Sequence, residues 1–129
     1  MTTTKSSMPT ILIVEDNPLN MRLAVFLLES AGYRLLQASD AETGIALAGA
    51  QQPDLILMDI QLPGMDGLSA TRQLKRDSAT RAIKVIACTG LAMMGDDERV
   101  LAAGCDGYIS KPISADTFLL RIEEVLHQC

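Results

Sequence analysis

The feature that most constrains the fold of this chain is a regular alternation of short apolar runs with longer stretches of helical periodicity. The runs over Thr10–Val14 and Leu55–Met58 are almost wholly apolar and show no two-residue alternation. Such runs are typical of strands buried on both faces of a parallel sheet. Between them, Leu23, Leu27 and Leu28 recur at the spacing of one helix face. The pattern predicts an α/β domain of the (βα)5 type, doubly wound, with helices on both faces of a parallel sheet.

Turn and capping residues set the expected limits of each element. Gly32 is suited to end the first helix, and Ser39 with Glu42 three residues later matches a capping box at the start of the second. Ser114 is a favoured N-cap for the last helix. The expected strands are Thr10–Val14, Arg34–Ala38, Leu55–Met58, Lys84–Ala87 and Gly107–Ser110, and the expected helices begin near Pro18, Ser39, Gly67, Met94 and Ser114.

Length and composition indicate one domain with a packed core. The chain has 129 residues, 48% of them hydrophobic, and a net charge of −5, which disfavours nonspecific binding to nucleic acid. No apolar run approaches the roughly 18 residues that span a bilayer, and the start lacks an apolar signal core. We therefore expect a cytoplasmic protein that has no membrane contact, with residues 1–9 as a flexible tail and residues 10–128 as the domain.

Three cysteines and one histidine are the residues of this chain that could bind a soft metal such as zinc. The cysteine count is odd, and the spacings match no zinc pattern. Cys88 and Cys105 have apolar or small neighbours and are predicted to be reduced core thiols, whereas Cys129 is expected to be exposed. His127 is interpreted as a residue at a helix end.

Polar side chains gather where the predicted strands end. Glu15 and Asp16 follow the first strand, Asp59 the third, Thr89 the fourth and Lys111 the fifth, and ligands of open α/β sheets bind outside these carboxyl ends. Any one of these residues alone is more often structural. Together, the carboxylates would repel each other unless a hard cation such as Mg²⁺ neutralised them, while Lys111 and Thr89 could bind phosphate oxygens. Asp59 is the best candidate for a nucleophile that forms an aspartyl phosphate.

Several motifs in order carry a resemblance to a known family. They are Ile11–Asn17 (ILIVEDN), Leu55–Ile60 (LILMDI), Pro63–Gly67 (PGMDG), Thr89 and Tyr108–Pro112 (YISKP). On these motifs the chain resembles the receiver domain of two-component response regulators over essentially residues 10–128. It is similar to single-domain regulators of the cell-cycle type and to receivers attached to hybrid histidine kinases. The resemblance implies a flavodoxin-like sheet of strand order 2-1-3-4-5.

The resemblance also implies the parts of a metal site. Asp59 would be the phosphoacceptor and a metal ligand. Asp16 would bind Mg²⁺ directly, and Glu15 would act largely through water. The backbone carbonyl of Gln61 would be the third protein ligand.

A second set of residues would hold the phosphoryl group and respond to it. Thr89 and Lys111 resemble the pair that binds the phosphoryl oxygens. Tyr108 resembles an aromatic switch that turns inward when Thr89 moves toward the phosphoryl group. The bond between Lys111 and Pro112 is expected to be cis, as in the family.

The implied function is a single-domain response regulator in a phosphorelay. A histidine kinase or histidine phosphotransfer protein would supply the phosphoryl group, and protein contacts with an unknown downstream target would transmit the signal. No DNA-binding segment follows the last helix, so direct DNA binding is not expected. A receiver excised from a hybrid histidine kinase is the alternative; Met1 and a helix that ends near the last residue favour the free-standing form.

Three other hypotheses fit the sequence less well. An aspartyl phosphatase would be a true enzyme, but it usually carries a second Asp where this chain has Gln61. A flavin-binding electron carrier needs a phosphate loop after the first strand, where Glu15 and Asp16 would repel the phosphate. A degenerate receiver used as a scaffold would lack key residues, and here all of those positions are filled.

Overall fold

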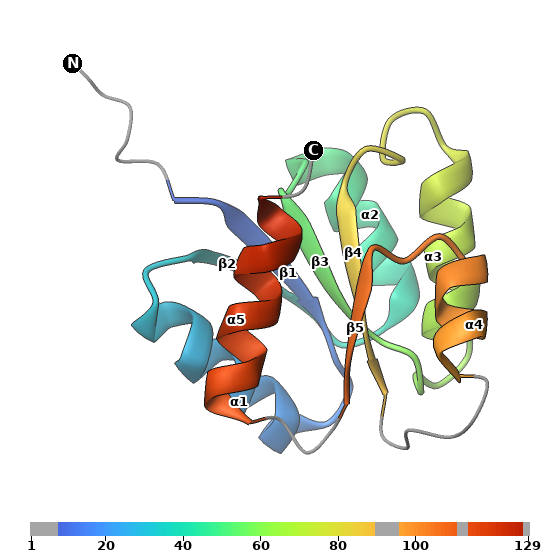
Figure 1. Ribbon diagram of the computed structural model, residues 1–129. Coiled ribbons are helices and arrows are strands. Elements are labelled where there is room, and N and C mark those ends of the chain that lie inside the picture. The colour runs from blue at the N-terminus through green and yellow to red at the C-terminus, as the bar shows by residue number, and fades with distance from the viewer. Residues whose placement is uncertain (1–7, 90–95, 111–113, 128–129) are drawn as a thin grey trace.

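The structure is a computed structural model that describes residues 8–89, 96–110 and 114–127 and has three layers, a parallel sheet between two layers of helices (Figure 1). Lys111, the Lys111–Pro112 bond, Met94 and Cys129 lie outside the described residues. Strands and helices alternate in the order β1 (Thr10–Val14), α1 (Pro18–Ser30), β2 (Arg34–Ala38), α2 (Ala41–Gln51), β3 (Leu55–Asp59), α3 (Gly67–Arg76), β4 (Lys84–Thr89), α4 (Asp96–Ala102), β5 (Gly107–Ser110) and α5 (Ala115–Leu126).

The five strands form one sheet in the order β2-β1-β3-β4-β5, and every neighbouring pair is parallel. This order confirms the doubly wound, flavodoxin-like fold that the resemblance implies. β3 occupies the centre, where it pairs with β1 on one side and β4 on the other. Asp59 therefore ends the central strand.

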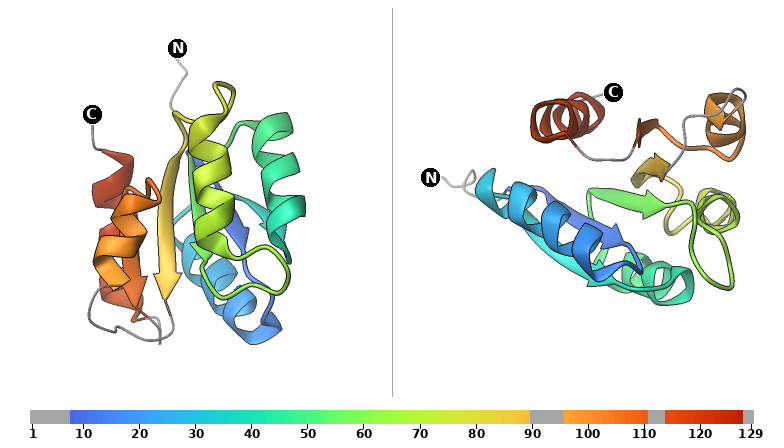
Figure 2. Two further views of the ribbon diagram at one scale, coloured as in Figure 1. Left: turned by 90° about the vertical axis from the view of Figure 1, so that its right-hand side faces the viewer. Right: turned by 90° about the horizontal axis from the view of Figure 1, so that it is seen from below.

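The core consists of two apolar layers, one on each face of the sheet. In β1, Ile11 and Ile13 belong to one layer while Leu12 and Val14 belong to the other, because successive side chains of a strand point to opposite faces. α1 and α5 cover the first face, and α2, α3 and α4 cover the second (Figure 2). Burial on both faces explains why the strands read as continuous apolar runs.

The ends of several elements differ from the predictions in detail. The N-cap of α2 is Asp40, not Ser39: one Asp40 carboxylate oxygen accepts a hydrogen bond of 2.7 Å from the Thr43 amide. Ser114 holds the N-cap position of α5, but its side chain makes no capping hydrogen bond. β3 and β4 each run further than expected and include the two polar residues at their ends, Asp59 and Thr89.

The loop after β1 is fixed by Asn17, which caps α1 and was not predicted from the sequence. The Asn17 side-chain oxygen accepts hydrogen bonds from the amides of Leu19 at 2.9 Å and Asn20 at 3.1 Å, and Pro18 occupies the first turn of α1. Both features favour a helix start. The cap therefore fixes the chain directly after Glu15 and Asp16. Among the described helices, none has both the length and the apolarity needed to cross a bilayer.

Candidate metal and phosphoryl site

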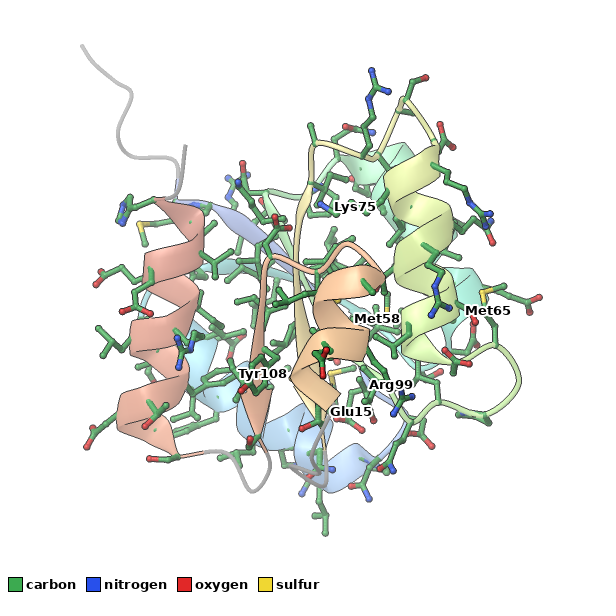
Figure 3. All side chains as sticks on the ribbon, turned by 45° about the vertical axis from the view of Figure 1, so that its right-hand side comes forward. Glu15, Met58, Met65, Lys75, Arg99 and Tyr108 are labelled. Carbon is green, nitrogen blue, oxygen red and sulfur yellow. The ribbon has the colours of Figure 1, made fainter. Side chains whose placement is uncertain are left out.

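Three carboxylates meet at the carboxyl edge of the sheet. Glu15 and Asp16 follow β1, and Asp59 is the last residue of β3, the strand that pairs with β1. One oxygen from each of these side chains lies within 4.8 Å of the others. Figure 3 shows Glu15 at this edge, with Lys75 at the opposite end of the sheet. The geometry confirms the convergence predicted from the strand ends for these three acids.

The three carboxylates differ in their exposure to solvent. Glu15 is 6% exposed and Asp59 is 3% exposed, whereas Asp16 is open to solvent. Two buried carboxylates beside a third acid repel each other strongly unless a cation or a proton intervenes. The all-oxygen donor set matches hard divalent cations such as Mg²⁺ and lacks the nitrogen and sulfur ligands typical of zinc. These residues fit Mg²⁺, and Asp16 leaves the site accessible from the solvent.

Backbone amides orient the two buried acids. The Gln61 amide donates to Oδ1 of Asp59 at 2.9 Å, and the Asn17 amide donates to Oε2 of Glu15 at 3.2 Å. The Ile60 amide donates to the Cys88 carbonyl at 3.1 Å, which extends the pairing of β3 with β4 past the strand end. The two buried acids are therefore held by backbone amides of residues that lie just beyond the ends of β1 and β3. The chain at Gln61, whose carbonyl the resemblance names as a ligand, turns directly beside Asp59.

Thr89 lies at the end of β4, one residue beyond the Cys88 that pairs with Asp59. Its side chain is 1% exposed, and within the described part of the chain its Oγ1 atom has no hydrogen-bond partner. A buried hydroxyl without a partner costs about 1–3 kcal/mol. Its position beside the acids makes Thr89 suitable as a donor to an anion bound at the same edge.

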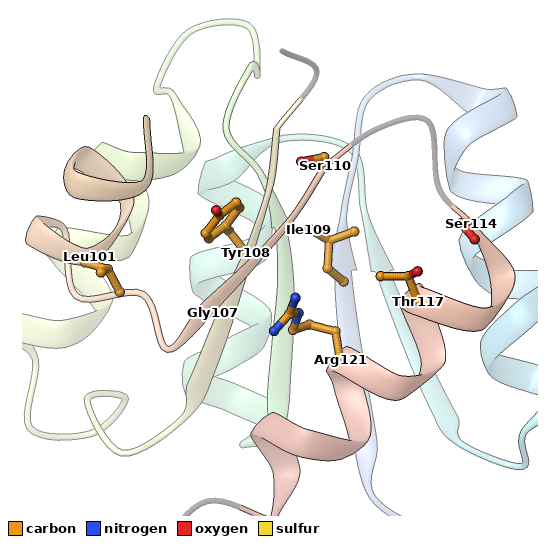
Figure 4. Close-up of a pocket in the computed structure, with 8 residues that line it drawn as sticks. All are labelled: Leu101, Gly107, Tyr108, Ile109, Ser110, Ser114, Thr117 and Arg121. Carbon is orange, nitrogen blue, oxygen red and sulfur yellow. The ribbon is translucent and has the colours of Figure 1, made fainter. Parts of the chain in front are cut away.

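Tyr108 lies in β5 opposite Ala87 of β4 and is 39% exposed. Its side chain points away from the sheet, into a pocket on the molecular surface (Figure 4). The inward turn expected of this aromatic residue remains a prediction. Lys111 follows β5 directly but falls outside the described residues.

One residue of the site was overlooked at the level of sequence. Gly67 was placed in the PGMDG motif and near the start of a helix, without a role in the site, but it packs directly on the backbone of Asp59 and Ile60. The sequence signal was present in the pair Asp66–Gly67. Asp66 caps α3, with Oδ1 accepting from the Ser69 amide at 2.8 Å, so that Gly67 becomes the first helical residue.

The fold and the site together define a class of protein: a flavodoxin-like domain with a cluster of three acids at the carboxyl end of its central strand. The sequence profile of the response regulator receiver domain matches residues 11–123. The chain belongs to the response regulator receiver domain family.

Relatives and solved structures agree with this membership. The polar-differentiation response regulator DivK of Brucella anthropi is 48% identical over 116 residues, covering 90% of this chain and 94% of that protein. The receiver domain of a sensor histidine kinase from Pseudomonas aeruginosa PAO1, solved with magnesium coordinated in its active-site cleft, is 35% identical with a TM-score of 0.87, covering 95% of this chain and all of that one. A CheY-like receiver domain protein from Methanospirillum hungatei is 32% identical with a TM-score of 0.85, and the match covers 93% of this chain and 94% of that one.

Proposed function

We propose that Asp59 accepts a phosphoryl group from a phosphohistidine of a histidine kinase or a histidine phosphotransfer protein. The Asp59 carboxylate attacks phosphorus, a bond forms between oxygen and phosphorus, and the bond between phosphorus and the donor nitrogen breaks to release the histidine. The observation that carries the proposal is the convergence of Glu15, Asp16 and Asp59 within 4.8 Å at the end of the central strand. Family membership supplies the reaction class.

Mg²⁺ is the proposed cofactor, with Glu15, Asp16, Asp59 and the backbone carbonyl of Gln61 as its protein ligands. When bound, the ion offsets the charge of the attacking carboxylate and of the phosphoryl oxygens. The neighbour from Pseudomonas aeruginosa holds magnesium in its cleft, which supports the same cofactor here. The Gln61 amide orients the Asp59 carboxylate through its bond of 2.9 Å to Oδ1.

Thr89 and Lys111 are proposed to bind the other phosphoryl oxygens. Thr89 contributes a hydroxyl that is buried and, among the described residues, has no partner. Lys111 contributes a point charge from the position directly after β5. Water later hydrolyses the acyl phosphate, so the protein acts as a phosphoacceptor switch without steady turnover of a free substrate.

Output is proposed to pass through Thr89 and Tyr108. When Thr89 moves toward a bound phosphoryl group, space opens for Tyr108 to turn inward, which biases a two-state equilibrium. Tyr108 lines a pocket of about 540 Å³ together with Leu101 of α4 and Arg121 of α5 (Figure 4). An inward turn of Tyr108 would reshape this surface, and a downstream protein would bind there. We propose this protein contact, and not binding to DNA, as the output.

The wider setting is proposed as a free-standing, cytoplasmic single-domain regulator with residues 1–9 as a tail outside the domain. The match to DivK covers 94% of that protein, which supports the single-domain form. The alternative is a receiver that belongs to a hybrid histidine kinase, since the neighbour from Pseudomonas aeruginosa is the receiver of a sensor kinase.

The test is incubation with Mg²⁺ and acetyl phosphate, followed by intact-mass analysis. We expect one added phosphoryl group on the wild-type chain and none on Asp59→Asn. Asp116→Asn, which changes an exposed acid in the first turn of α5, is the matched control and should be labelled like the wild type. Labelling that survives Asp59→Asn would overturn the assignment, and continuous hydrolysis of a phosphomonoester would favour a phosphatase instead.

A further inference from the structure

We propose that Gly67 and Thr71 are positioning residues that hold the end of β3 in the shape the metal and phosphoryl site requires. Neither residue contributes an atom to the acid cluster. Each acts through the backbone of Asp59, Ile60 and Gln61. The inference rests on the proposed function and assigns a role to two residues of α3.

Gly67 touches the backbone of the phosphoacceptor itself. A Cβ atom at this position would overlap the carbonyl oxygen of Asp59 and lie 2.7 Å from the Cα atom of Ile60. Both are main-chain atoms, which cannot rotate away as the end of a side chain can. The Gly67 amide also donates to the Ile60 carbonyl at 3.3 Å. Because Gly67 has no side chain, the loop between β3 and α3 can return to within contact of the end of β3.

This contact bears directly on both kinds of proposed metal donor. The Asp59 carboxylate and the Gln61 carbonyl flank Ile60, and the Gln61 amide bonds to Oδ1 of Asp59. A side chain at Gly67 would push the peptide between Asp59 and Ile60 away from Gly67. That displacement would move the Asp59 carboxylate and the Gln61 carbonyl together. Changes to residues that contact a metal's ligands typically lower the affinity for the metal by about 10–100-fold.

Thr71 holds Gly67 in place through a hydrogen bond to its carbonyl. Its side chain is fully buried, and Oγ1 donates to the Gly67 carbonyl at 2.8 Å. The same oxygen lies 3.9 Å from the thiol of Cys105, in the segment that precedes β5. The Thr71 hydroxyl therefore contacts both the first residue of α3 and the segment before β5. Through the Gly67 carbonyl it holds the start of the helix against the end of β3.

The chain offers variants that separate positioning from general stability. Gly67→Ala adds the clashing atom, Thr71→Val removes the hydroxyl, and Thr71→Ser keeps it. Gly104→Ala is the control, because its φ of 102° is unfavourable for alanine and a Cβ there would lie 2.9 Å from Cγ of Lys75, at the far end of the sheet. Two quantities are measured: the Mg²⁺ dissociation constant by calorimetry and the labelling rate with acetyl phosphate. Urea unfolding of each variant gives its free energy of unfolding, so that a loss of stability can be told apart from a loss of Mg²⁺ affinity.

We expect Gly67→Ala and Thr71→Val to raise the Mg²⁺ dissociation constant at least about 10-fold and to slow labelling by a similar factor. Thr71→Ser should restore both values, and Gly104→Ala should lose stability while binding Mg²⁺ like the wild type. If Gly67→Ala does not fold, the comparison of Thr71→Val with Thr71→Ser decides the question.

Wild-type Mg²⁺ affinity in folded Gly67→Ala, or equal affinities for Thr71→Val and Thr71→Ser, would overturn the inference. A wild-type chain that binds Mg²⁺ but takes no phosphoryl group would overturn the proposed function alone, because the Mg²⁺ titrations still report on positioning. A wild-type chain that binds no Mg²⁺ would overturn both.

Discussion

The ammonium group of Lys75 lies 3.0 Å from the carboxylate of Asp106 and ties the end of α3 to the turn before β5. The same ammonium donates to the carbonyls of Ile83 at 2.8 Å and Arg81 at 3.3 Å, and the carboxylate accepts from the Val85 amide at 2.8 Å. This network joins α3, β4 and β5 at the end of the sheet opposite the acid cluster (Figure 3). Its role is therefore structural.

Replacing Lys75 with methionine should lower the free energy of unfolding by about 1–3 kcal/mol. The change keeps most of the aliphatic stem but removes the ammonium from two carbonyls and from a partly buried carboxylate, which then keeps only its bond from the Val85 amide. Both charged side chains retain about a fifth of their exposure, at 20% and 22%, so the cost stays below that of a fully buried pair. Urea unfolding measures it, and labelling with acetyl phosphate should be unchanged.

The pair of Arg121 and Glu124 provides the comparison for this prediction. Their charged atoms lie 3.4 Å apart, but the side chains are 48% and 54% exposed. Arg121→Ala should therefore change the free energy of unfolding by no more than about 0.5 kcal/mol. Equal losses for the two variants would contradict the role assigned to the Lys75 network.

Replacing Thr89 with valine should make the unphosphorylated protein more stable and impair its reaction. The hydroxyl is buried and, in the described part of the chain, unpartnered, so its removal relieves a desolvation penalty of about 1–3 kcal/mol. The same hydroxyl is the proposed donor to the phosphoryl group, and its loss should slow labelling and shorten the lifetime of the acyl phosphate. Urea unfolding and intact-mass time courses measure the two effects.

Thr80→Val is the matched control, and it should lower the free energy of unfolding, whereas Thr89→Val should raise it. The Thr80 hydroxyl is also buried, but it donates to the Leu74 carbonyl at 2.7 Å. Its loss leaves that carbonyl unsatisfied and should cost about 1 kcal/mol or more, without an effect on labelling. A Thr89→Val protein that is less stable than wild type would show that the hydroxyl has a structural partner.

The strands and the position of the site could be predicted because each depends on local pattern. β1 and β3 are apolar on both faces, and parallel neighbours necessarily bring Glu15, Asp16 and Asp59 to one edge. The strand order, by contrast, came from the resemblance, since apolar runs carry no information about their neighbours.

The features that were missed depend on the path of the chain in space. Ser39 and Asp40 both suit an N-cap, and only the backbone conformation chooses Asp40, whose β-region dihedrals aim its carboxylate at the Thr43 amide. The contact of Gly67 with Asp59 is created by the loop that returns to the strand end. Lys75 and Asp106 are 31 residues apart, and no periodicity links them.

Mg²⁺ should stabilise the fold, and its removal with a chelator should reverse the effect. A ligand that binds only the native state adds about 2.7 kcal/mol at 100 times its dissociation constant. Asp16→Asn should abolish most of this gain. Without metal, however, Asp16→Asn should be more stable than wild type by about 1 kcal/mol, because it removes one of three carboxylates within 4.8 Å of each other.

Thermal unfolding with Mg²⁺ and with chelator measures both halves of this prediction. Asp116→Asn serves again as the control, because it removes an exposed carboxylate that does not belong to the cluster of three acids, and it should leave the response to Mg²⁺ intact. An Asp16→Asn variant that keeps the full response to Mg²⁺ would place the ion elsewhere. An Asp16→Asn variant that is less stable than wild type with Mg²⁺ and more stable without it would show that Asp16 serves metal binding and not the stability of the fold.

The two buried cysteines should be unreactive in the native state at neutral pH. Cys88 and Cys105 are both buried, with exposures of 3% and 6%, and burial raises the pKa of the Cys105 thiol to about 11. The thiolate is the reactive form, so neither cysteine should react with Ellman's reagent at pH 8 faster than the protein unfolds. Fast modification of Cys105 in the Cys88→Ala variant would show that the segment before β5 opens locally.

The raised pKa of Cys105 also predicts how stability depends on pH. The folded state favours the neutral thiol, so below the ordinary value of 9.0 the group has no effect on the pH dependence. As the pH rises from 9 toward 11, the unfolded chain loses this proton first, and the free energy of unfolding falls. At about 1.4 kcal/mol for each unit of pKa, the loss approaches about 2–3 kcal/mol above pH 11. Cys105→Val should flatten this slope relative to wild type in urea unfolding, whereas parallel slopes would contradict the burial of the thiol.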